Sequence, residues 1–184
     1  MKSKLKKSLK DKQFVLDEIT RISEREAQAK VDEISFGLIL VFFLHETGPI
    51  PLMVTPESLS SFELALHALA DRSFSIFGFV TNPDETKNAS FGFQFQKEKC
   101  TVFGYDFAIL NSESPDNKDS FILCFLVRPP RGNLEILSLF YHELLEYYQK
   151  IRGLMTIKAD QELVLKEMHN VRLFYAKAML ALVK

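Results

Sequence analysis

The chain has 184 residues, of which 47% are hydrophobic and 26% charged, values that fit one globular domain with a substantial core. Its net charge of −1 argues against a general attraction to nucleic acid. No stretch reaches the roughly 20 apolar residues that cross a bilayer, and the N-terminus lacks the apolar region of a signal peptide, so we expect a cytoplasmic protein.

The first thirteen residues are strongly basic. They contain one acid, Asp11, and six lysines: Lys2, Lys4, Lys6, Lys7, Lys10 and Lys12. One interpretation is a solvated tail or the frayed start of a helix. The other is a weak contact of these lysines with an anionic lipid surface or with an acidic partner.

A helix is predicted over residues 14–31, because apolar residues recur there at helical spacing. These residues are Val15, Ile19 and Ile22. The apolar face is thin, so the helix either lies against the domain or pairs with another chain. We therefore divide the chain into a basic tail with an N-terminal helix, residues 1–33, and a single domain, residues 34–184.

A hairpin is predicted next. Residues 34–44 are β-branched and aromatic with little polar interruption, as in a central strand buried on both faces. Gly48 and Pro49 mark a turn, and residues 50–54 form the returning strand. Pro51 cannot donate a ladder hydrogen bond, so it belongs at the start of that strand or on its unbonded side.

A helix should follow the hairpin. Thr55 supplies a hydroxyl N-cap, Pro56 suits the first helical position, and an apolar stripe continues to about Arg72. The stripe consists of Leu59, Phe62, Leu66 and Leu69. Residues 74–80 are expected to be extended, and residues 82–88 to form a polar loop.

Three more strands are predicted over residues 90–96, 100–110 and 120–127. In the first of them phenylalanines alternate with small and polar residues, so the strand is half exposed, and its aromatic residues are a candidate partner face: Phe91, Phe93 and Phe95. Gly104 is a candidate for a β-bulge. Asp106 is either a buried, paired acid or a residue on the open face of the sheet, and we prefer the open face.

Two helices complete the chain. Asn133 is the predicted cap of a long helix that runs to about Arg152, where Gly153 fits a C-terminal cap. The last helix is predicted over about residues 157–183. Both carry an apolar stripe at helical spacing, so both are expected to pack on the sheet.

No catalytic or cofactor-binding motif is present. The chain has neither a Gly-rich phosphate loop nor a GxSxG elbow. His142 opens a sequence like the zinc-protease HExxH signature, but Glu146 replaces the second histidine, which removes a metal ligand. Cys100 and Cys124 lie in apolar runs and are predicted to be buried free thiols. We therefore expect no catalytic residue, no metal site and no cofactor.

The order of the predicted elements resembles that of longin and roadblock domains, including archaeal ones. Both families combine two hairpin strands, a helix, a three-stranded meander and a long helix. The pair of C-terminal helices favours the longin side, whereas the N-terminal helix is a roadblock feature. The stretch LVFFLHETGPIPLMV looks like the opening hairpin of these proteins, with Gly48 and Pro49 at its turn.

This resemblance implies an α/β (α+β) fold with a five-stranded antiparallel sheet in the order 2-1-5-4-3, flanking helices in a profilin-like arrangement and an extra N-terminal helix. It also implies a non-catalytic scaffold that forms homo- or heterodimers and binds or regulates a small Ras-like GTPase or a trafficking-type complex. Such a domain has protein partners and requires neither a cofactor nor nucleic acid.

Two other functions stay open. A small-molecule sensor of the PAS, GAF or profilin-like kind also combines such a sheet with flanking helices, and its Phe-rich strands would line a ligand pocket. An enzyme would need a site assembled from scattered residues, for which the candidates are His45, His67, Asp106 and Glu143.

Overall fold

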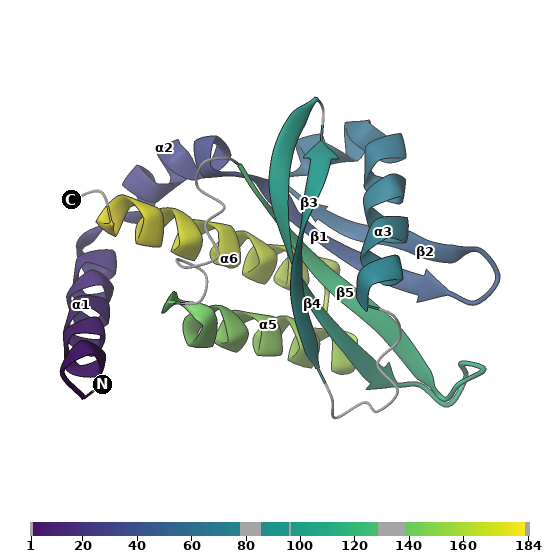
Figure 1. The fold of residues 1–184 in the computed structure, drawn as a ribbon. Helices are drawn as coiled ribbons and strands as arrows, with labels where there is room; N and C mark the ends of the chain where they lie inside the picture. Colours follow the sequence, from purple (N-terminus) through teal and green to yellow (C-terminus); the bar gives the residue numbers. More distant parts are fainter. Residues whose placement is uncertain (1, 78–85, 96, 129–138, 183–184) are drawn as a thin grey trace.

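The computed structural model describes residues 2–77, 86–95, 97–128 and 139–182, and for residues 2–11 it describes the backbone alone. A five-stranded antiparallel sheet lies at the centre, with helices on both faces (Figure 1). The strand order is β2-β1-β5-β4-β3, which confirms the predicted fold class and topology. The strands are β1 (Ser35–Leu44), β2 (Gly48–Thr55), β3 (Lys87–Phe95), β4 (Glu98–Leu110) and β5 (Lys118–Val127).

β1 and β5 occupy the middle of the sheet because their side chains are apolar on both faces. The first seven residues of β1 and the last eight of β5 are all buried. The side chains on both faces of these strands therefore pack against helices, and a separate hydrophobic core forms on each side of the sheet.

One face of the sheet is covered by a short 3₁₀ helix, η1 (Glu57–Phe62), and by α3 (Glu63–Phe77). A Cβ atom added at Gly104 of β4 would lie 2.1 Å from the ring of Phe77, so the absence of a side chain lets α3 approach the strand. Pairing with both neighbouring strands runs through Gly104 without a shift in register, so the predicted bulge is wrong.

The opposite face is covered by α2 (Glu24–Ile34), α5 (Tyr141–Thr156) and α6 (Gln161–Ala181). Their shared core with the sheet is rich in aromatic residues: Tyr105, Phe107, Phe121, Phe125, Tyr148 and Tyr175. In the part of the chain that the structure describes, no helix combines the length and the apolar run that crossing a membrane requires.

The predicted N-terminal helix is two helices. α1 (Lys2–Arg21) ends before Ser23, whose hydroxyl oxygen accepts a hydrogen bond from the Glu26 backbone N–H (3.2 Å) and caps α2. Serine followed by glutamate three residues later is the spacing of a capping box, a signal that the apolar periodicity masks. Because of this break, α1 and α2 contact different parts of the domain.

α1 packs on the C-terminal end of α6 through Val15, Ile19 and Ile22, which are buried against Ala178 and Ala181. α2 instead contributes to the core on the sheet. Its buried residues are Ala27, Val31 and Ile34.

The turn between β1 and β2 lies earlier than the sequence indicated. Residues 45–47 form it, and Gly48 is already paired with Leu44 at the start of β2. Gly48 has a φ of 88°, a left-handed conformation that glycine adopts at little cost. Pro49 pairs with Phe43, so it belongs to the strand, and the predicted Gly48-Pro49 turn is corrected accordingly.

The helix after β2 also differs from its prediction. Thr55 ends β2, and Pro56, not Thr55, takes the N-cap position of η1. α3 then continues to Phe77, so residues 74–77 are helical where an extended segment was predicted. Most of the predicted loop at residues 82–88 lies outside the described residues, and its last two belong to β3.

The bounds of the C-terminal helices differ from the prediction: α5 ends later than expected, and α6 is shorter than expected at both ends. Gly153 lies inside α5, which continues to Thr156, and Lys158 takes the left-handed conformation (φ 51°) in the connection. α6 begins at Gln161 because the Asp160 side chain accepts a hydrogen bond from the Glu162 backbone N–H (2.9 Å). The predicted cap at Asn133 lies outside the described residues.

Candidate functional site

The two edges of the sheet differ in how well they are protected. β2 carries Pro49 and Pro51, and a shift in its register with β1 falls between Leu40 and Val41. Proline has no backbone N–H to offer a further strand, and irregular pairing distorts an edge. The β2 edge is therefore a poor template for another strand.

The β3 edge lacks such protection. This strand has nine residues without a proline, and it pairs with β4 in continuous register from Lys87–Asp106 to Phe95–Glu98. No strand within the described residues pairs with its other side. β3 therefore presents a row of backbone donors and acceptors along one edge of the molecule (Figure 1).

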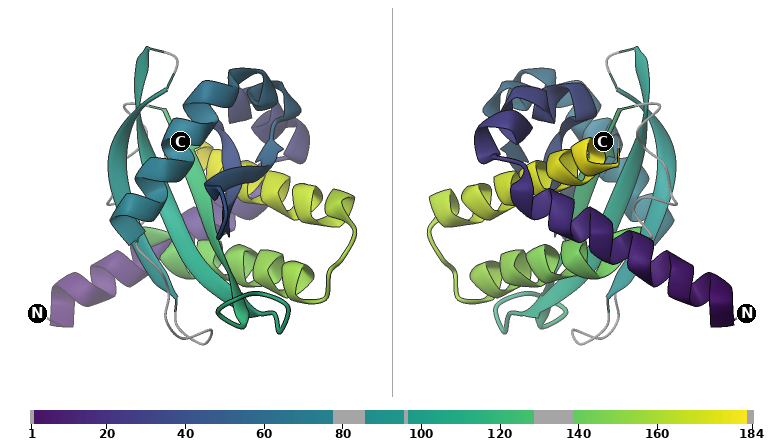
Figure 2. Two further views of the ribbon diagram at one scale, coloured as in Figure 1. Left: turned by 90° about the vertical axis from the view of Figure 1, so that its right-hand side faces the viewer. Right: turned by 90° about the vertical axis from the view of Figure 1, so that its left-hand side faces the viewer.

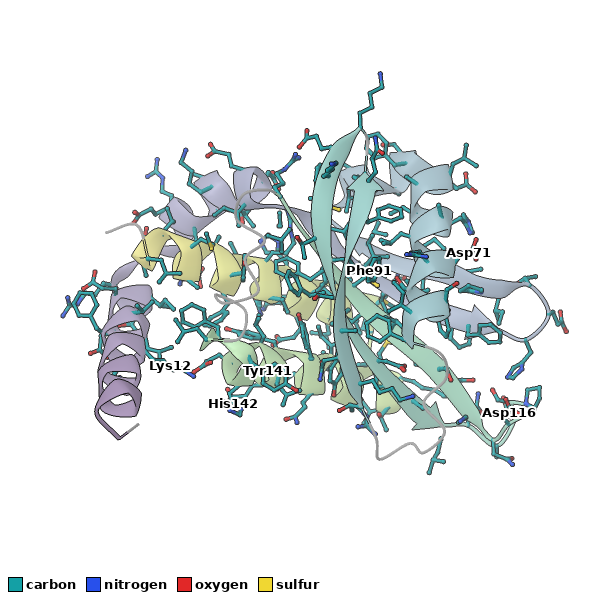
Figure 3. The ribbon with its side chains drawn as sticks, viewed as in Figure 1. Lys12, Asp71, Phe91, Asp116, Tyr141 and His142 are labelled. Carbon is teal, nitrogen blue, oxygen red and sulfur yellow. The ribbon has the colours of Figure 1, made fainter. Side chains whose placement is uncertain are left out.

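The side chains of β3 alternate as the sequence predicted. Ala89, Phe91 and Phe93 are half-buried towards the α3 layer, where Figure 3 places Phe91. The residues between them are exposed on the other face of the strand: Asn88, Ser90, Gly92 and Gln94.

Phe95 does not belong to an accessible partner face. Its side chain is fully buried, and its ring centre lies 5.2 Å from that of Phe36 and 5.8 Å from that of Phe62. The predicted partner face of Phe91, Phe93 and Phe95 is therefore corrected to its first two members. Phe95 is a core residue because it closes the layer between β3, β1 and η1.

Further apolar surface adjoins β3 on the α3 side. Phe62 touches the Phe95 ring yet remains 38% exposed. We call the outer edge of β3 together with Phe62, Phe91 and Phe93 the edge surface. It combines a strand edge that no other described strand covers with partly exposed aromatic rings, and this combination suits an added strand and its side chains.

The sequence placed Phe62 on the buried stripe, and its partial exposure was missed. The reason is a change of helix type, because η1 turns with three residues and α3 with 3.6. A stripe drawn at one period through both helices therefore overestimates how far Phe62 is buried. The run of serines before Phe62 was the available signal of an irregular start.

The residues considered for an enzyme do not converge. Asp106 lies in β4, and Glu143 lies on α5 against the other face of the sheet, where it pairs with Lys12 (2.9 Å). His45 is in the β1–β2 turn, with Nε2 3.7 Å from an Asp116 oxygen. Figure 3 shows Lys12 and Asp116 at opposite ends of the molecule. Within the described residues, no three metal-ligating side chains cluster.

Asp106 is buried, not exposed on an open face as the sequence reading preferred. Neither carboxylate oxygen has a hydrogen-bond partner in the described structure. Burial raises the pKa of Asp106 to about 7, an effect that the charges of Lys87 and Lys118 only partly oppose. The neutral and charged forms of the Asp106 carboxyl group are therefore both populated near pH 7.

Both cysteines are free and buried, as predicted. Burial raises the pKa of Cys100 to about 11 and that of Cys124 to about 12. The Sγ atom of Cys124 lies 3.1 Å from the hydroxyl of Ser73 on α3. Both thiols are thus protonated at neutral pH and unsuited to nucleophilic chemistry.

An open pocket of about 480 Å³ lies at the end of the sheet where β4 leads into β5, beside the α5–α6 connection. Its apolar lining includes Met53, Ile109, Phe121 and Met155. Polar groups from the connecting loops surround this floor: Asn111, Glu113, Asp119 and Lys158. Phe121 of β5 lines this pocket, whereas the phenylalanines of β3 do not contribute to it.

The predicted anionic-surface lysines lie on α1. Lys12 is the one whose side chain the structure describes, and it pairs with Glu143 of α5. Lys2, Lys4, Lys6, Lys7 and Lys10 belong to the helix by their backbone, and their side chains lie outside the described part.

No protein-family model matches the chain, and no curated protein matches it. The resemblance to longin and roadblock domains therefore stays a prediction that rests on element order and on the opening hairpin.

Proposed function

We propose that this chain is a non-catalytic protein-interaction domain of the longin-like or roadblock-like kind, which pairs with a second copy or with a partner protein through the edge surface. The observation that carries the proposal is the contrast between the two edges of the sheet. β2 is protected by Pro49 and Pro51, whereas β3 offers nine residues without proline or bulge.

Strand addition explains why such an edge suits binding. An added strand satisfies the outward N–H and C=O groups of β3, and its side chains lie beside alternate residues of β3. Phe91 and Phe93 would then lose their remaining exposure on one face of the joined sheet. Edge pairing alone buries little area, so the adjoining Phe62 is expected to extend the interface.

The partner class that we propose is a small Ras-like GTPase or a trafficking-type complex in the cytoplasm. The support for this class is the element order, since longin-like and roadblock-like domains act as scaffolds for such proteins. A scaffold of this kind acts through its surfaces, and the scattered titratable residues and protonated thiols described above are consistent with that role.

The test uses charge at two exposed positions of β3. The variant Ser90→Glu/Gly92→Glu places two glutamates at exposed positions of β3. The fold should tolerate both changes, because a Cβ atom at Gly92 meets nothing within 4 Å. Charged side chains on an edge strand oppose the addition of a further strand, so pairing through this edge should be lost. Gln149→Glu/Gln161→Glu adds the same charge at exposed positions on α5 and α6.

Light scattering over a range of concentrations, with capture of purified small GTPases, gives the readout. We expect the wild type and the α5/α6 control to double the chain mass of 21.2 kDa or to retain a GTPase, and the β3 variant to do neither. A wild-type chain that stays monomeric and captures no GTPase contradicts the proposal. A β3 variant that behaves like the wild type in both assays contradicts the assignment of the surface.

A small-molecule sensor is the second candidate, and the pocket of about 480 Å³ is the observation that favours it. Its floor of two methionines and two larger apolar residues could adapt to an apolar ligand. Native mass spectrometry of the purified chain would then show a co-purifying ligand that Met155→Glu removes. A single species at the mass of the bare chain argues against this function.

A further inference from the structure

The N-terminal segment and the remainder of the chain have opposite charges. Residues 1–13 contain six lysines and one aspartate, a net charge of +5. The whole chain has a net charge of −1, so the other residues together carry −6. This separation cannot arise from a uniformly mixed surface, and it concentrates positive charge at one end of α1.

The charged segment extends from a part of α1 that is packed on the domain. Val15, Ile19 and Ile22 attach the C-terminal half of α1 to α6, and Lys12 pairs with Glu143 of α5. Residues 2–11 continue the same helix beyond these contacts for about 15 Å. In both views of Figure 2 the N-terminal end of α1 extends away from the rest of the domain.

The base of α1 is held firmly. Ser23 caps α2, and Arg172, almost fully buried on α6, donates to an Asp32 oxygen of α2 at 2.6 Å and to the Ser35 hydroxyl at 3.2 Å. Both α1 and α2 are thereby attached to α6, α1 through its apolar residues and α2 through Arg172. The basic segment is consequently presented from a fixed point and not from a long flexible linker.

The sequence of the segment combines lysines with two leucines. Leu5 and Leu9 are four residues apart and fall on one face of the helix. Lysines surround them, and no acid precedes Asp11. A short basic helix with a narrow apolar face is typical of segments that lie in a membrane interface.

We propose that the N-terminal half of α1 binds the surface of an anionic phospholipid membrane. The lysines meet the negative headgroups, and Leu5 and Leu9 enter the boundary between headgroups and acyl chains. A nucleic-acid backbone fits less well, because it offers no apolar layer for Leu5 and Leu9. The proposal is independent of the edge surface, which lies on the α3 side of the sheet.

The experiment measures co-sedimentation of the full chain with vesicles of phosphatidylcholine alone and of phosphatidylcholine with phosphatidylserine. We expect binding only to the vesicles that contain phosphatidylserine. Binding should weaken as salt is raised, because salt screens the attraction between the lysines and the headgroups. Lys6→Gln/Lys7→Gln/Lys10→Gln should lower the partition coefficient about a hundredfold, from roughly fivefold for each lysine. Circular dichroism checks that the variant stays folded, which we expect because these residues precede the docked part of α1.

A matched control removes the same charge elsewhere. Lys97, Lys99 and Lys166 are exposed on the β3–β4 hairpin and on α6, and their triple change to Gln should leave vesicle binding within about twofold of the wild type. Absence of binding to phosphatidylserine vesicles, or equal losses in both triple variants, overturns the proposal.

The leucines distinguish a membrane from an acidic polypeptide. Leu5→Ser/Leu9→Ser should reduce vesicle binding at least tenfold and leave the binding of poly-glutamate unchanged, because a soluble polyanion offers no apolar layer. If this variant binds vesicles as well as the wild type and poly-glutamate competes fully, the segment binds an acidic protein surface instead, and the membrane assignment is wrong.

Discussion

At the residue scale, Asp106 places a carboxyl group inside the layer between the sheet and α3. Its two oxygens lack hydrogen-bond partners in the described structure, and burial raises its pKa from 3.8 to about 7. Between about pH 4 and pH 7 the folded chain holds a proton that the unfolded chain releases. The contribution of Asp106 to stability is therefore largest below pH 4 and declines as the pH rises to 7.

Asp106→Asn tests this effect, because the amide has the same shape and does not titrate. We expect the variant to gain stability relative to the wild type as the pH rises, with the difference in unfolding free energy about 2 kcal/mol larger at pH 8 than at pH 5. Urea denaturation at the two pH values measures the difference. If the difference in unfolding free energy between the variant and the wild type is the same at pH 5 and pH 8, Asp106 does not titrate between them.

At the element scale, the contact of α3 with β4 depends on a missing side chain. Phe77 at the end of α3 occupies the space above Gly104, where a Cβ atom would lie 2.1 Å from its ring. We expect Gly104→Ala to lower the free energy of unfolding by about 1–3 kcal/mol through overpacking. Gly92→Ala on β3 is the control, since its Cβ meets nothing within 4 Å, and should change stability by less than about 0.5 kcal/mol.

Denaturant unfolding of the two alanine variants supplies the comparison. If both glycines tolerate alanine equally, Phe77 moves away without cost, and the tight approach of α3 to β4 is not a determinant of the fold. If Gly104→Ala alone is destabilised, the position of α3 on the sheet depends on that residue.

The strands were predictable because their signal is strong and local. The apolar runs of β1 and β5 require burial on both faces, and that condition places them in the centre of any sheet. The helix boundaries were less predictable because short-range hydrogen bonds decide them. Ser23 splits one apolar stripe into two helices, and α5 continues through Gly153 because nothing there requires a left-handed residue.

The candidate site was only half predictable for a related reason. Alternation along β3 fixes which residues share a face, and it correctly grouped Phe91 with Phe93 and Phe95. Alternation does not reveal which face a helix covers. The buried Phe95 therefore could not be distinguished in the sequence from the half-buried Phe91 and Phe93. The vulnerability of the β3 edge also depends on strand order, which emerges from tertiary packing.

At the scale of the whole molecule, the two proposed surfaces lie on opposite sides of the sheet. The edge surface adjoins α3, whereas α1 packs on α6 in the other layer (Figures 1 and 2). A partner strand on β3 and a membrane at the N-terminal end of α1 therefore contact different elements. The domain would act as a scaffold that holds a protein partner near an anionic surface.

The most direct test of the interaction role is hydrogen exchange of residues 87–95, measured at low protein concentration and then at high concentration or with a captured GTPase. No strand within the described residues pairs with the outer side of β3, so its outward-facing amides should exchange fast in the monomer and slow markedly on association. Ser90→Glu/Gly92→Glu should abolish that slowing. Association that leaves exchange in β3 unchanged, or that protects β2 instead, would contradict the assignment of the β3 edge as the binding surface.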